Sequence, residues 1–178
     1  FDCAKTLKAR GFNAVVVGGD NLLADKYVSG LFSMLKLIDN PLDDAALVEA
    51  SLSIYGRVID EELVEAAHIV RKFRKENPKD SLPLWHAYET LAGEHPESSV
   101  GFFVNLISSA AARLDRQPLR VIAQYIFSAA GVAYSLKNFS GELESYLAEE
   151  SFSNVLTFLD LLQHWQKGGM TNRTCFLR

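Results

Sequence analysis

The sequence predicts a mainly α-helical protein: a bundle of about seven helices with one short β segment near the N-terminus. Through most of the chain, apolar residues recur at the 3.6-residue spacing of helices. Two Asn-Pro pairs, Asn40-Pro41 and Asn77-Pro78, interrupt this pattern where helices should end. Only residues 13–17 form a short β-branched run that favours a strand.

The first part of the chain is expected to be a short helix followed by that strand. Residues 2–10 are predicted as the helix, ended by Gly11, a residue suited to the left-handed conformation after a helix. The strand at 13–17 stops at Gly18. A lone strand needs partners, so its neighbours are expected in another part of a longer protein from which this chain would be excised.

The next two helices are predicted on either side of Pro41. The first has one apolar stripe, formed by Val28, Leu31, Leu35 and Ile38. Pro41 ends it through Asn40, and Asp43 is predicted to cap a second helix that runs to Leu52.

A third helix is predicted from Asp60, its expected N-cap, with Glu61 and Glu62 in the first turn, where acids favour the helix dipole. Its inward residues are expected to be Leu63, Ala67, Val70 and Phe73. Basic residues gather near its end: Arg71, Lys72, Arg74, Lys75 and Lys79. Helical spacing places Arg71, Arg74 and Lys75 on one outward face.

Four further helices are predicted, at 83–91, 100–114, 119–130 and 152–165, with loops at 93–99 and 138–141. Their aromatic residues have core-like spacing: Trp85, Tyr88, Phe102, Phe103, Tyr125, Phe127, Phe152, Phe158 and Trp165. A base-stacking platform would need aromatic side chains exposed beside cations, which this pattern does not indicate.

Composition and charge limit the function classes. The 178 residues are 48% apolar and 22% charged, as in an ordinary soluble domain, and no apolar run approaches membrane-spanning length. The two cysteines, near opposite ends, suit a reducing cytosol, so a cytoplasmic location is expected. A net charge of −4 argues against a dedicated nucleic-acid-binding protein, although a local basic face can still contact phosphates.

No catalytic or metal-binding residue is predicted. The pair Gly18-Gly19 lacks the further glycines and the Lys-Ser/Thr of a phosphate-binding loop. The four histidines are dispersed, without the spacing that a metal site needs. Acidic pairs such as Asp43-Asp44 fall where helices begin, so capping explains them.

Residues 14–44 resemble the strand exit and first accessory helix of the superfamily 1 DNA helicases of the UvrD/RecB type. That family shows an apolar strand ending in Gly-Gly, two bulky residues, and an amphipathic helix that closes on Asn-Pro before an acid. The matching elements are Gly18-Gly19, Leu22-Leu23, the run from Leu35 to Pro41, and Asp43-Asp44. Residues 4–11 resemble the helix before that strand, and "SIYGRVIDEEL" at 53–63 is closer to the AddA/RecB helicase–nuclease branch.

The resemblance implies three parts: residues 1–19 as a remnant of the second RecA-like lobe, 20–168 as an accessory helical domain, and 169–178 as a tail or the start of the return to the motor lobe. Such a domain of an ATP-dependent DNA helicase or helicase–nuclease subunit would contact duplex DNA and regulate unwinding. The family's ATPase and nuclease motifs match no position here. The chain itself is therefore expected to be inactive and without a cofactor, with ATP and magnesium bound elsewhere in the parent protein.

The implied partners are duplex or fork-junction DNA, the remainder of the helicase chain, and a nuclease or helicase subunit, in the cytoplasm at the nucleoid and without a membrane. The implied DNA-binding residues are Tyr55, Gly56 and Arg57, with Arg71, Arg74 and Lys75 as electrostatic support. For these cations, a solvated helix end is the alternative interpretation. A second hypothesis for the whole chain is a stand-alone α-helical protein–protein interaction module, whose acidic region at 20–65 faces a basic partner.

Overall fold

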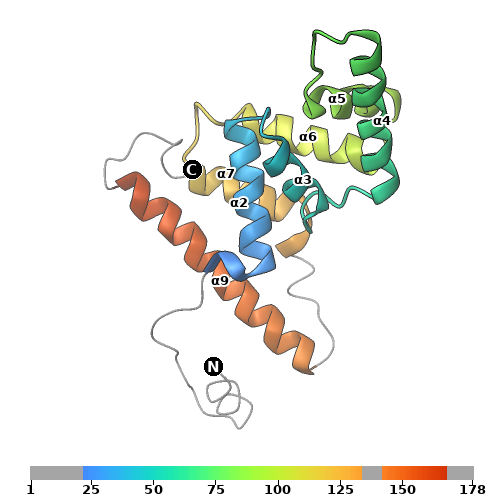
Figure 1. Ribbon diagram of the computed structural model, residues 1–178. Coiled ribbons are helices and arrows are strands. Elements are labelled where there is room, and N and C mark those ends of the chain that lie inside the picture. The colour runs from blue at the N-terminus through green and yellow to red at the C-terminus, as the bar shows by residue number, and fades with distance from the viewer. Residues whose placement is uncertain (1–21, 134–141, 168–178) are drawn as a thin grey trace.

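The computed structural model describes residues 22–133 and 142–167. This part of the chain is helical, with seven α-helices and one 3₁₀ turn (Figure 1). In chain order the elements are η1 (Leu22–Ala24), α2 (Lys26–Asp39), α3 (Asp44–Leu52), α4 (Asp60–Glu76), α5 (Leu84–Glu94), α6 (Ser99–Ala111), α7 (Leu119–Ala129) and α9 (Glu142–Lys167). The predicted bundle of about seven helices is confirmed. The predicted helix at 2–10, the strand at 13–17, the loop at 138–141 and the tail at 169–178 lie outside the described residues.

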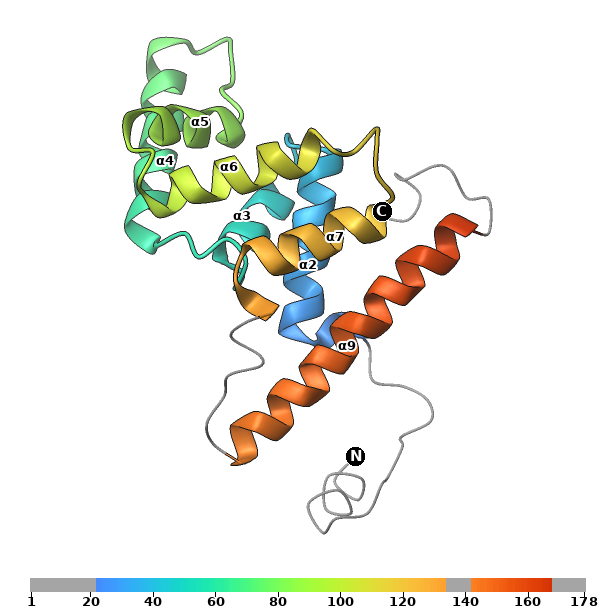
Figure 2. The same cartoon turned by 180° about the vertical axis from the view of Figure 1, so that it is seen from behind.

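The central element is α2, which packs against α3, α6, α7 and α9. Figure 2 shows α6 and α7 crossing α2 from the other side. All four residues of the predicted apolar stripe are buried, and so are Met34 and Leu37 on other faces. These two extra positions are buried because neighbouring helices surround α2 instead of covering one side of it.

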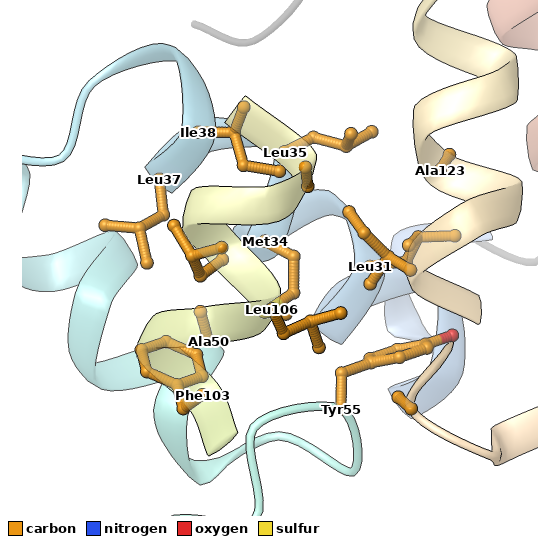
Figure 3. Packing of buried hydrophobic residues seen from close by; sticks show 14 of the residues in the cluster. Leu31, Met34, Leu35, Leu37, Ile38, Ala50, Tyr55, Phe103, Leu106 and Ala123 are labelled. Atoms are coloured by element: carbon orange, nitrogen blue, oxygen red, sulfur yellow. The ribbon is translucent and has the colours of Figure 1, made fainter. Parts of the chain in front are cut away.

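Figure 3 shows the part of the core where α2 meets α3, α6 and α7. Leu31 and Met34 of α2 are fully buried, as is Phe103 of α6. Tyr88 of α5 makes an edge-to-face contact with Phe103, with ring centroids 5.9 Å apart. Truncating one large side chain in such a core typically costs about 2–5 kcal/mol, so this region supplies much of the stability of the fold.

Both ends of α2 are capped: the end at Asn40 is the one that the sequence predicts, and the structure adds an N-cap at Asp25. At its start, one carboxylate oxygen of Asp25 accepts the Tyr27 N–H at 2.8 Å and the Val28 N–H at 3.3 Å. The other oxygen accepts the Asn154 side-chain amide at 3.1 Å, which joins α9 to the first turn of α2. At its end, the Asn40 N–H donates to Lys36 O, and Pro41 follows.

The predicted cap of α3 is confirmed, whereas that of α4 is wrong. Asp43 precedes α3, and its carboxylate accepts the Ala46 N–H at 3.0 Å. For α4, the N-cap is Ile59 and no side chain caps the helix. Asp60 is instead the first helical residue, where its charge still favours the dipole together with Glu61.

The predicted inward face of α4 also needs correction. Ala66 is the one buried residue of this helix, whereas Ala67, expected inside, is exposed. Leu63, Val70 and Phe73 are half-buried. α4 packs mainly against α5, at the edge of the molecule, so only a narrow face centred on Ala66 meets the bundle.

The last described helix, Glu142–Lys167, is longer than the predicted 152–165. It packs against α7, where the Arg120 guanidinium donates to Gln163 Oε1 and lies 3.3 Å from the Asp160 carboxylate. Of the aromatic residues expected in the core, Phe102 is 44% exposed, because its neighbour Phe103 takes the inward direction on α6. Within residues 22–133 and 142–167, no helix combines the length and apolar character needed to cross a membrane.

Candidate nucleic-acid interface

The outer face of α4 carries the predicted group of cations. Arg71, Arg74 and Lys75 are exposed and lie within little more than one helical turn. Together with Val64 and Ala67 they line a shallow hollow of about 560 Å³. The structure therefore places these three predicted residues on one accessible surface.

The positive charge of this face is not neutralised within the described part of the chain. Ion pairs there join Lys36 to Asp43, His86 to Glu89, and Arg120 to Asp160, and none involves a residue of α4. Arg74 and Lys75 stand in the last turn, where cations also favour the helix dipole. Helix stabilisation and anion binding are both compatible with this placement.

A second hollow, of about 420 Å³, adjoins the first. It lies between α4, the turn before α3 and the loop before α5, with Leu42 and Val70 on its walls and Asp44 and Arg74 at its margin. Leu42 is 58% exposed and Val64, in the first hollow, is 57% exposed. The sequence pattern did not single out either residue, because an isolated Leu or Val carries no signal of exposure.

Tyr55, a predicted DNA-binding residue, belongs to the turn after α3 and is fully buried against α2 (Figure 3). Its hydroxyl donates to the Tyr27 carbonyl at 2.9 Å. Burial raises the pKa of Tyr55 well above its ordinary value, and the Asp25 carboxylate adds to this effect. The side chain is not accessible to DNA, and we assign it a packing role.

Gly56, the next predicted residue, is also buried. A Cβ at this position would lie 2.4 Å from the Ala50 carbonyl oxygen and 2.5 Å from that of Ser51. The glycine is therefore required by the close approach of the turn to the last turn of α3. This packing role replaces the predicted contact with DNA.

Arg57 is exposed and has a left-handed backbone, with φ of 55°. Its Nε donates to the Ile54 carbonyl at 3.1 Å, which holds the side chain across the turn. Asp60, just beyond the turn, precedes Arg71 by eleven positions, or about 16 Å of helix. Arg57 and the α4 cations thus lie towards opposite ends of the same helix instead of forming one cluster.

Comparisons with known proteins identify no family for this chain. No protein-family model matches it, and no curated protein matches it. In the described residues, no three His, Cys, Asp or Glu side chains are grouped so that they could hold a metal ion.

Proposed function

We propose that this chain is the accessory helical domain of an ATP-dependent DNA helicase or helicase–nuclease subunit, and that it contacts duplex DNA through the outer face of α4. The observation that carries the proposal is the set of three exposed cations, Arg71, Arg74 and Lys75, which have no ion-pair partner among the described residues. ATP and magnesium would be bound elsewhere in the parent protein.

The local structure of the helicase-like stretch supports this proposal. Leu22 and Leu23 belong to η1, which packs against α2. The run that resembles the helicase helix end coincides with the end of α2, and Asp43 behind it caps α3. In the described part of the stretch, from residue 22 on, these matching residues thus have physical roles at their positions, as expected if the likeness reflects a shared fold.

The chemistry available on α4 is contact with the phosphate backbone. Guanidinium and ammonium groups bind phosphate oxygens through charge-assisted hydrogen bonds, and these contacts carry no base sequence. Arg57, at the other end of the helix, could reach a separate phosphate. The proposed contact is therefore sequence-independent and strongly dependent on salt.

The test is a titration of fluorescently labelled duplex DNA at several salt concentrations. Each phosphate neutralised adds about 0.9 to the slope of log affinity against log salt. The double variant Arg71→Glu/Lys75→Glu is expected to lower the slope by about 2. A matched control, Lys26→Glu/Arg116→Glu, makes the same change in net charge at two exposed cations outside α4.

The proposal requires a smaller slope of log affinity against log salt for the α4 variant and an unchanged slope for the control. Equal slopes in wild type and both variants would remove these cations from the interface. The absence of any DNA binding by the wild type, even at low salt, would favour the alternative of a protein–protein interaction module.

A further inference from the structure

The exposed face of α4 carries charges of both signs in a fixed order. Asp60 and Glu61 lie at its start, and Arg74 and Lys75 at its end. All four are exposed, and none is in an ion pair with another described residue. We propose that this face is a self-association surface, on which α4 of a second copy of the chain packs in the antiparallel direction.

The spacing of the charges fits this arrangement. A two-fold axis between Ala67 and His68 places Asp60 about 11 Å along the helix on one side and Arg74 about 10 Å on the other. In an antiparallel pair, Asp60 and Glu61 of each copy therefore lie level with Lys75 and Arg74 of the other, so that each acid meets a cation. Because the two-fold axis repeats each contact, the dimer contains four such pairs.

The middle of the face suits close helix packing. Val64 is 57% exposed, and Ala67 is an exposed small residue at the expected axis. Across the axis, Val64 of one copy would lie against the aliphatic stem of Arg71 of the other. Val64 and Ala67 are free to contact a second copy because α4 packs mainly against α5 and leaves its outer side uncovered.

A second copy fits this surface better than a partner of a single charge. An acidic partner would be attracted to Arg74 and Lys75 but repelled by Asp60 and Glu61, and a basic partner would meet the reverse problem. A surface with the same order of charges, packed in the antiparallel direction, places a cation opposite each acid and an acid opposite each cation. One helix pair is smaller than a standard interface of about 1,600 Å², so the dimer is expected to be weak and reversible.

This inference goes beyond the proposed function, although the two share the basic half of α4. DNA binding would use the cations alone, whereas self-association needs the acids as well. Changes at Asp60 and Glu61 therefore separate the two: they should weaken the dimer and leave DNA affinity unchanged or raised.

The test is sedimentation equilibrium of the full chain between about 10 µM and about 1 mM, the range in which a small interface associates. Asp60→Lys/Glu61→Lys is expected to raise the dimer dissociation constant about tenfold or more, and so is Arg74→Glu/Lys75→Glu. Combining all four changes restores opposite charges across the axis and should restore the dimer. Circular dichroism checks that α4 still folds.

A further variant, Ala67→Arg, does not alter the paired charges. The residue is exposed, so the fold should tolerate the larger side chain, which would hold the two helices apart at the axis. A wild type that stays monomeric over the whole range overturns the inference, as does a dimer that Ala67→Arg leaves intact. If the variant with all four charge reversals has a folded α4 but does not regain the dimer, the antiparallel pairing is overturned. None of these results bears on the salt slope of DNA binding, which tests the proposed function alone.

Discussion

Replacing Gly56 with Ala should destabilise the protein because the new methyl group has no space. Its Cβ would lie 2.4 Å from Ala50 O, 2.5 Å from Ser51 O and 2.7 Å from Ser51 Cα. These are backbone atoms, which cannot rotate away as a flexible side chain would. The turn must move instead, and this strains the hydrogen bond from Val58 N–H to Ser51 O, now 2.9 Å long.

The expected magnitude combines two effects. Overpacking a well-filled site costs about 1–3 kcal/mol. A weakened backbone hydrogen bond adds up to about 1 kcal/mol. For a chain of this size, the sum of about 1–4 kcal/mol corresponds to a fall in melting temperature of about 2–16 °C.

Gly93 provides the matched control. It lies near the end of α5, where an added Cβ has no neighbouring atom within 4 Å. Gly93→Ala should therefore stabilise the protein by about 0.5–1 kcal/mol, since Ala lowers the entropy of the unfolded chain and favours helix. The same chemical change is expected to have opposite signs at the two positions.

Urea unfolding followed by far-ultraviolet circular dichroism measures both changes. If Gly56→Ala were as stable as the wild type, the tight packing of the turn against α3 would be refuted. If it were stable but bound DNA more weakly, the sequence-based interpretation of Gly56 as a DNA contact would return.

Two more predictions concern the same turn. Tyr55→Phe loses the hydrogen bond to Tyr27 O and should cost about 1 kcal/mol at neutral pH. Burial raises the pKa of Tyr55, so its hydroxyl stabilises the fold fully below the ordinary value of about 10 and progressively less above it, by about 1.4 kcal/mol per pH unit. By about pH 11 the wild type should have lost about 1.4 kcal/mol of unfolding free energy, so its advantage over the variant should disappear. Urea titrations that show the same difference in unfolding free energy at pH 7 and pH 11 would contradict this. Arg57→Gly removes the strain of a left-handed non-glycine residue, worth about 1 kcal/mol, so stability should hold or rise. If Arg57 contacts a phosphate, the salt slope of DNA binding falls by about 0.9, and an unchanged slope excludes the contact.

The strongest sequence patterns were the ones that predicted structure well. Along α2, the regular stripe and the Asn-Pro stop define both the face and the end of the helix, because each depends only on nearby residues. Asp43 is a similar case, since a cap acts within three residues of its own position. These features need no knowledge of the tertiary fold.

Tyr55 and Gly56 show what such local reasoning misses. A Tyr-Gly-Arg turn is typical of an exposed loop, and only tertiary packing makes it buried. Gly30, in the second turn of α2, creates the space: a Cβ there would lie 3.1 Å from Tyr55 Cδ2 and 2.9 Å from Ser53 Cβ. A glycine inside a strong helical pattern costs about 1 kcal/mol relative to Ala, which is a sign that something packs closely against it. That sign was present in the sequence, but nothing local connected it to a turn more than twenty residues away.

The charge order of α4 raises a similar question of specificity. Acids at the start and bases at the end favour the dipole of any helix, so many helices are self-complementary when turned around. Charge order alone therefore does not distinguish α4 from other helices. The structure also shows that Val64 and Ala67 are exposed. If α4 were rotated about its own axis, these two residues would lie in the core. With Ala66 facing the bundle, these two residues lie exposed between the opposite charges. The rotation of α4 is thus the feature that turns an ordinary distribution of charge into a surface suited to a second copy.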